Sequence, residues 1–142
     1  MKIAIKANKI IDGISDNIVK DKVIQIEDGV IKNIINFAEH FPSDDEKVFI
    51  YDSETILPGM IDVHVHLAYS GITNSRAFRA ESADMDYGEQ SLRGYSYAKD
   101  HMKFGFTSLR DMNAPGNVAI NIRDSINKQC LLGPNILACG LG

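Results

Sequence analysis

Two histidines separated by one residue are the side chains of this sequence best suited to chemistry. His64 and His66 lie in the mostly apolar run 60–67, which is typical of a buried strand. Because strand side chains alternate, Asp62 shares one face with both histidines. Same-face neighbours are about 6.6 Å apart, so each imidazole could place a nitrogen about 2.0–2.1 Å from one shared ion. The alternative is a pair of histidines on a solvated strand face.

The surroundings of the pair favour the metal site. The opposite face of the strand is continuously apolar, and the histidines stand at its C-terminal end. In parallel α/β folds that end of a strand is where active sites lie. Arg110 and Asp111 end a later predicted strand, where they could shape a pocket or form an internal ion pair.

Alternating strands and helices are predicted to position these residues. Strands at 60–67, 107–112 and 135–139 are separated by a polar loop over 68–86 and by helices at 89–104 and 117–129. This order predicts parallel βαβ units. The apolar spacing predicts which side chains line one face of each helix: Leu92, Tyr95, Lys99 and Met102 on the first, and Ala119, Ile122, Ile126 and Cys130 on the second.

The first 57 residues have a different pattern. Short alternating runs predict strands at 2–7, 23–27, 30–35 and 48–51. Asp28-Gly29 stands between two of them and predicts a tight hairpin, because the favoured turn needs positive φ at both central residues. The region is expected to be part of a small β-sandwich.

The run Leu57-Pro58-Gly59-Met60-Ile61-Asp62-Val63-His64-Val65-His66 resembles the metal-site signature of the amidohydrolase superfamily. Residues 24–31 resemble the hairpin of that family's N-terminal sandwich. Residues 104–111 and 133–137 resemble the branch containing imidazolonepropionase-like and Xaa-Pro dipeptidase-like enzymes. The resemblance implies an α/β plus β fold: a β-sandwich portion at 1–57, then the first three β/α units of a (β/α)8 TIM-type barrel at 58–142, incomplete in this chain.

The resemblance also implies a chemistry. His64 and His66 would bind a divalent metal, with zinc expected and manganese, iron or cobalt as alternatives. Such an ion polarises the scissile carbonyl and lowers the pKa of a bound water to about 7, so that an amide or other C–N bond can be hydrolysed. Asp62 would orient or support the ligands. The substrate of the whole enzyme would be a small-molecule amide, a cyclic amide or a dipeptide.

The family's remaining site residues come from later strands. They are a carboxylated lysine or glutamate, two more histidines and an aspartate that acts as general acid/base. We therefore expect no catalytic residue within this chain and no activity from it alone. The open barrel edge predicts self-association. The second hypothesis is a non-catalytic remnant that acts as an oligomerisation or interaction module.

Composition narrows the function classes. With 44% hydrophobic and 24% charged residues the chain is typical of a globular protein, and its net charge of -4 gives no basic surface for nucleic acid. No apolar run reaches the roughly 18 residues of a membrane span, and a cytoplasmic location is expected. No Gly-x-Gly-x-x-Gly turn supports a dinucleotide fold. Cys130 and Cys139 are expected to be buried and reduced, and His40 and His101 to be solvated.

Overall fold

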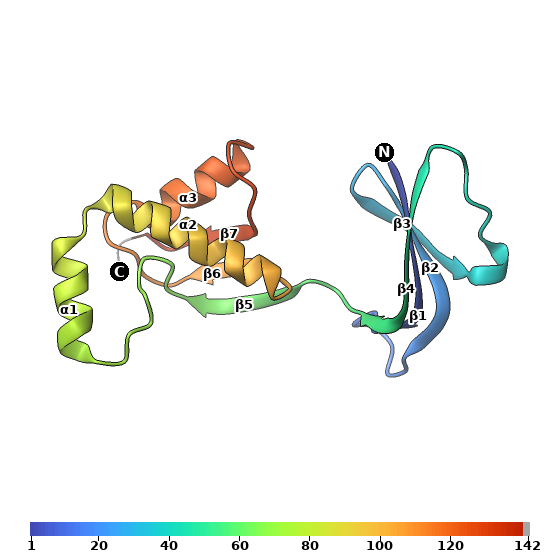
Figure 1. Ribbon diagram of the computed structural model, residues 1–142, viewed down its shortest axis with the longest axis horizontal. Coiled ribbons are helices and arrows are strands. Elements are labelled where there is room, and N and C mark those ends of the chain that lie inside the picture. The colour runs from blue at the N-terminus through green and yellow to red at the C-terminus, as the bar shows by residue number, and fades with distance from the viewer. Residues whose placement is uncertain (141–142) are drawn as a thin grey trace. The chain divides into compact units, whose positions relative to one another are not determined.

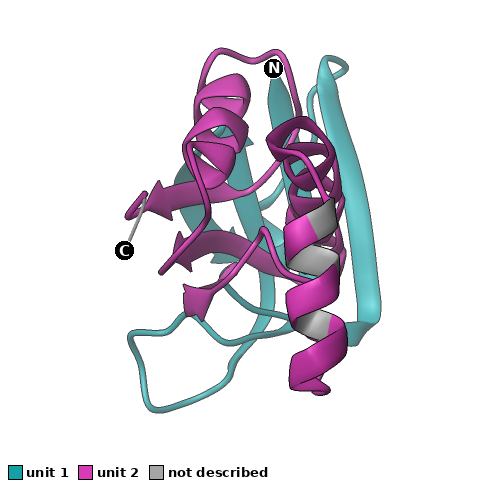
Figure 2. Cartoon of the chain, turned by 90° about the vertical axis from the view of Figure 1, so that its left-hand side faces the viewer, with its two compact units in different colours: residues 1–58 teal, residues 59–142 magenta. Residues whose placement is uncertain are grey.

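The computed structural model describes residues 1–140, apart from the side chains at 78, 81, 82 and 84. The chain divides into two compact units, Met1–Pro58 and Gly59–Gly142, which Figure 2 distinguishes by colour. None of the described helices is long and apolar enough to cross a membrane. The cytoplasmic location stays a prediction.

The first unit is a mixed four-stranded sheet in the order β3-β2-β1-β4. Its elements, seen in Figure 1, are β1 (Lys2–Ile10), β2 (Val19–Glu27), β3 (Val30–Asn36), the short 3-10 helix η1 (Phe37–Glu39) and β4 (Glu46–Ile56). The pairs β1–β2 and β2–β3 are antiparallel, whereas β1 and β4 run parallel. The predicted hairpin is confirmed, since Asp28 and Gly29 have φ values of 51° and 79°.

One side chain of this unit departs from expectation. His40 was predicted to be solvated, but its side chain is only 7% exposed and its Nε2 lies 2.9 Å from Oε2 of Glu46.

The apolar core of the sheet consists of Ala7, Ile10 and Ile24 with their neighbours.

The second unit is a three-stranded parallel sheet in the order β5-β6-β7, which confirms the predicted βαβ pattern. Its elements are β5 (Met60–Val65), α1 (Ser75–Asp84), α2 (Tyr87–Lys103), β6 (Phe106–Asp111), α3 (Val118–Asn127) and β7 (Asn135–Ala138). The helices α2 and α3 pack against each other and against the sheet (Figure 1). Leu67, Leu109, Val118 and Ile122 form the centre of the core between these layers.

The predicted polar loop over 68–86 is wrong, because it contains α1. The helix begins after Asn74, whose side-chain oxygen accepts hydrogen bonds from the backbone N–H groups of Arg76 and Ala77. These bonds satisfy two of the donors that a helix start leaves open.

The predicted buried face of α2 is wrong for Leu92 and Met102, whereas Tyr95 does pack against the core. Leu92 is 75% exposed and Met102 is 43% exposed. The buried positions are instead Gln90, Gly94 and Ala98, spaced four residues apart. Glycine stands at position 94 because the helix lies close to the segment after β5: a Cβ atom added to Gly94 would come 2.8 Å from the carbonyl oxygen of Leu67.

The two cysteines were predicted to be buried, and this too is wrong. Cys130 and Cys139 are both exposed and unpaired with each other. Cys139 directly follows β7, and Cys130 lies three residues after the end of α3, so both stand outside the regular elements.

Candidate metal centre

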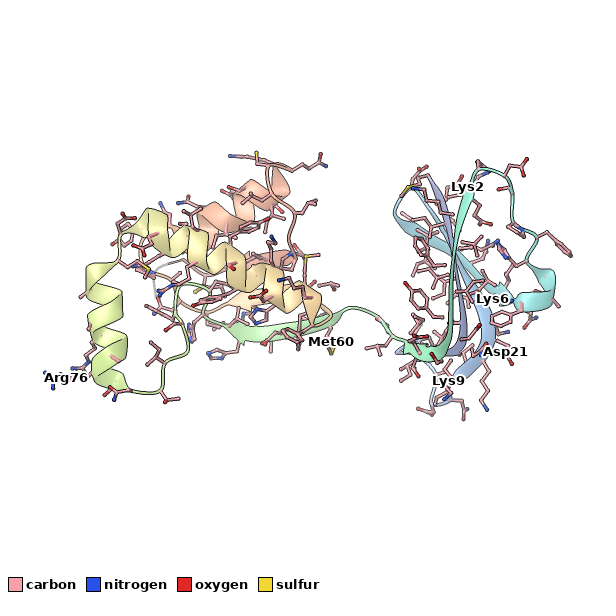
Figure 3. All side chains as sticks on the ribbon, in the orientation of Figure 1. Lys2, Lys6, Lys9, Asp21, Met60 and Arg76 are labelled. Atoms are coloured by element: carbon pink, nitrogen blue, oxygen red, sulfur yellow. The ribbon has the colours of Figure 1, made fainter. Side chains whose placement is uncertain are left out.

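The two histidines of the motif stand together at the C-terminal end of β5. His64 lies within the strand and His66 follows its last residue, and both are exposed. Their ring centroids are 5.2 Å apart with the planes at 74°. Figure 3 shows the side chains along β5, which starts at the labelled Met60. Alternation along the strand therefore brings the pair to one face, as the spacing predicted.

The ring of His66 is held from one side. Its Nδ1 lies 3.4 Å from the carbonyl oxygen of Asn113. Because a carbonyl oxygen only accepts, a hydrogen bond here has Nδ1–H as its donor, and in the neutral imidazole Nε2 then carries the lone pair. A metal-binding histidine is commonly oriented by such a bond from its other ring nitrogen. Sequence reasoning missed Asn113, because a backbone carbonyl has no residue signature.

The side chain of Asp62 hydrogen-bonds to the backbone of His64, two residues further along β5. Its Oδ1 accepts a hydrogen bond of 3.0 Å from the backbone N–H of His64. The carboxylate thereby satisfies a donor on β5, an edge strand of the described sheet.

Arg110 and Asp111 separate at the end of β6. Arg110 is exposed, whereas Asp111 is fully buried. Both lie in the part of the chain that the structure describes, and the internal ion pair that was the alternative for them does not form. One carboxylate oxygen of Asp111, Oδ2, accepts a hydrogen bond of 2.8 Å from the backbone N–H of Leu67.

Burial governs the electrostatics of Asp111. Loss of hydration raises the pKa of this carboxyl above its ordinary value, while backbone hydrogen bonds from Leu67 and Asn113 and the nearby His66 act in the opposite direction. Its other oxygen, Oδ1, has no hydrogen-bond partner among the described atoms.

Further bonds fasten the chain on either side of His66. The backbone N–H of Met112 donates to the carbonyl oxygen of Val65 at 2.9 Å, and that of Tyr69 donates to the carbonyl oxygen of His66 at 3.2 Å. The guanidinium of Arg93, on α2, donates to the carbonyl oxygen of Ala68 at 3.0 Å. The backbone around the ligand pair is therefore tied to β6 and α2.

A cavity of about 540 Å³ opens beside the pair. Asp62, His64 and His66 supply polar groups on one part of its wall. Aromatic rings supply much of the rest: Tyr97 on α2, Phe104 directly after α2, and Phe106 on β6. His101 also lines it, with Nδ1 2.8 Å from the carbonyl oxygen of Tyr97 and its ring packed on Phe106. The prediction that His101 is solvated is thus wrong.

The two histidines are suitable ligands for a divalent transition metal, but they make up only part of a ligand set. Two neighbouring imidazoles suit zinc and related ions, and His66 has its outer nitrogen free. Among the described residues, however, no cluster of three or more His, Cys, Asp or Glu side chains is placed to hold an ion. Catalytic zinc sites use three protein ligands, so the pair is suited to be one part of a larger ligand set.

Comparisons with known proteins agree with this geometry. Residues 55–141 match the amidohydrolase family. A solved Xaa-Pro dipeptidase with methionine bound in its active site is 32% identical, with a TM-score of 0.84 over 99% of this chain and 34% of its own. Molinate hydrolase is 23% identical, with a TM-score of 0.87 over 99% of this chain and 30% of its own.

Ochratoxinase from A. niger shares the fold at 20% identity, with a TM-score of 0.73 over 96% of this chain and 30% of its own. No curated protein matches the chain. The chain spans about a third of the length of the solved structures it matches.

Proposed function

The chain belongs to the amidohydrolase family, and we propose that it supplies two metal ligands, His64 and His66, to a hydrolase that cleaves an amide or other C–N bond. Membership and the neighbouring structures imply a hydrolase. The single observation that carries the metal proposal is the position of the two imidazoles, 5.2 Å apart at the C-terminal end of a parallel strand.

The residues around the pair have distinct tasks in this proposal. His64 and His66 hold the ion, with zinc as the expected metal and manganese, iron or cobalt as alternatives. Asp62 fixes the backbone N–H of His64, and the carbonyl of Asn113 keeps the Nδ1 proton of His66 in place. A divalent ion bound there would supply Lewis-acid polarisation of the scissile carbonyl and acidify a water molecule. Arg110, exposed at the end of β6, lines a separate cavity of about 190 Å³, and we propose that it helps to shape the substrate site from there.

The proposed substrate is a small molecule with an amide or related C–N bond, such as a dipeptide or a cyclic amide. Two observations support it. The neighbouring structures include a dipeptidase and a phenylurea hydrolase. The cavity beside the pair is lined by the rings of Tyr97, Phe104 and Phe106, which suit an apolar group on the substrate.

The architecture of the whole site is part of the same proposal. We assign the sheet β5-β6-β7 with its helices to the first three β/α units of a (β/α)8 barrel, and the sheet of residues 1–58 to part of a β-sandwich. The remaining ligands and the general acid/base would then come from later barrel strands. On this assignment residues 1–142 have no hydrolase activity of their own.

The experiment is a hydrolysis assay on Xaa-Pro dipeptides, cyclic amides and phenylureas, run on the protein that carries this chain and on residues 1–142 alone. The expected result is activity in the former that a chelator abolishes and added metal restores, and none in the latter. Chelator-resistant hydrolysis would refute the metal dependence. Hydrolysis by the 142-residue chain would refute its dependence on later residues.

One observation favours the second candidate, an interaction module. Ile61 and Val63 of β5 are 66% and 62% exposed, and Leu137 of β7 is 65% exposed. Both strands are edges of the described sheet, and exposed apolar edge strands promote pairing with another chain. Light scattering after size-exclusion chromatography tests this: a concentration-dependent oligomer that Val63→Lys disperses would support it, and a monomer at all concentrations would exclude it.

A further inference from the structure

Asp111 is the most deeply buried carboxyl group of the described residues, with no exposed surface. A carboxylate loses its hydration when it is buried, so such a position is unfavourable unless specific contacts compensate. Leu109, two residues earlier on the same strand, lies in the apolar core. An aliphatic side chain at position 111 would have continued that pattern.

The contacts of Asp111 lead to His66 by two routes. Through Oδ2 it accepts the hydrogen bond from the backbone N–H of Leu67, the residue directly after His66. Asn113 follows Asp111 by two residues along the chain, so the second route is covalent. The carbonyl of Asn113 in turn contacts Nδ1 of His66. Asp111 therefore connects the backbone that carries the His66 side chain with the carbonyl that orients its ring.

We propose that Asp111 is a positioning residue that holds His66 with the proton on Nδ1 and with Nε2 available to a divalent metal. The inference rests on the proposed function for its metal, but the orientation of the ring is independent of metal loading. A hydrogen bond to a charged acceptor is shorter and stronger than one between neutral groups, so the carboxylate fixes the two backbone segments more firmly than a neutral acceptor.

A purely structural role would make a different prediction. If Asp111 only satisfied the N–H of Leu67, its replacement would lower the stability of the fold and leave the tautomer of His66 unchanged. If it positions the ring, the tautomer and the metal affinity must change in a variant that is still folded. The ring nitrogens therefore report the role directly.

The test uses the whole protein that carries this chain, with Asp111→Leu, Asp111→Asn and, as a matched control, Asp100→Asn. Asp100 is a carboxylate that lines the same cavity but pairs with Lys103. Long-range 1H–15N NMR of metal-free protein identifies the protonated nitrogen of His66, and titration with Co2+ gives the affinity. Circular dichroism establishes that each variant is folded.

We expect the Nδ1-protonated form in the wild type, Asp111→Asn and Asp100→Asn, and a mixture of tautomers in Asp111→Leu. Asp111→Asn should bind Co2+ more weakly than the wild type, because a neutral acceptor holds the N–H of Leu67 less firmly than a carboxylate. Outer contacts of a metal ligand typically change affinity by about 10–100-fold, and Asp111→Leu should lose Co2+ affinity in that range. A folded Asp111→Leu with the wild-type tautomer and affinity would overturn the inference. Should that variant not fold, an Nε2-protonated His66 in the wild type, or an Asp111→Asn variant with undiminished Co2+ affinity, would overturn it.

Failure of the proposed function gives a different result. A wild-type protein whose His66 is protonated on Nδ1, but which binds no Co2+, would count against the metal site and leave the orienting role of Asp111 intact.

Discussion

Replacing Gly94 by alanine should push α2 away from the segment that follows His66. The added Cβ would lie 2.8 Å from the carbonyl oxygen of Leu67 and 2.9 Å from Cδ1 of Ile122. The isoleucine has rotamers to adopt, but the carbonyl is backbone and is held next to the hydrogen bond from Leu67 to Asp111. Overpacking of this kind costs about 1–3 kcal/mol.

The helix itself would gain from the substitution, because alanine is favoured over glycine in a helix interior by up to about 1 kcal/mol. We expect a net loss of about 1 kcal/mol or more in the free energy of unfolding. For a unit of this size, each kcal/mol lowers Tm by about 4–8 °C. The metal affinity should fall as well, since Leu67 follows His66 directly.

The assay is thermal and urea unfolding of Gly94→Ala beside Ser96→Ala, an exposed position on the same helix. The control should have an unchanged or slightly raised Tm. A Gly94→Ala protein with wild-type or higher Tm would refute the close approach of α2 to the end of β5.

Two further predictions concern the N-cap of α2 and the pH dependence of stability that Asp111 contributes. Asp86→Ala removes the side-chain oxygen that accepts from the N–H of Glu89 at 2.8 Å, and should destabilise α2 by about 0.5–2 kcal/mol in urea unfolding. Asn117→Ala, at a helix start with no side-chain cap bond, should cost much less, and equal losses would contradict the capping role. Burial raises the pKa of Asp111 above its ordinary value of 3.8, so the folded state binds this proton more readily than the unfolded state. The stabilisation that the folded state gains by binding this proton is therefore complete below pH 3.8 and is lost as pH rises through the raised pKa of Asp111. Asp111→Asn should remove the decline, and identical pH profiles for the two proteins would contradict it.

Features that depend on local periodicity were predictable from the sequence. The alternation along 60–67 placed Asp62, His64 and His66 on one face, and the structure brings the two rings together there. Asp28-Gly29 specified a hairpin because both residues adopt positive φ. The alternation of strands and helices after residue 58 indicated a parallel sheet, since such connections require crossovers.

Features that depend on packing were not predictable in this way. The apolar residues of α1 are mostly alanines, so its cap residue Asn74 is its clearest mark in the sequence. The buried face of α2 consists of Gln90, Gly94 and Ala98, and at Gly94 the close approach of Leu67 leaves no room for a larger side chain. A search for regularly spaced large apolar residues does not detect a buried face made of glycine, alanine and glutamine.

Features that depend on long-range backbone contacts were also hidden. The bond from Leu67 to Asp111 joins residues 44 apart, and the one from His66 to Asn113 joins residues 47 apart. In each case one partner is a backbone group, which every residue type possesses. Arg110 and Asp111 read as a charge pair in the sequence, but alternation along β6 sends one outward and the other inward.

The central claim is that His64 and His66 together bind a divalent metal. It is tested most directly by isothermal titration of Zn2+ into the whole protein that carries this chain, its His64→Ala/His66→Ala double variant and its His101→Gln variant, which replaces a histidine that lines the same cavity outside the pair. The account predicts saturable binding of one Zn2+ in the wild type and in His101→Gln, and affinity at least about 10-fold weaker in the double variant. No binding to the wild type, or equal binding to all three proteins, would contradict it.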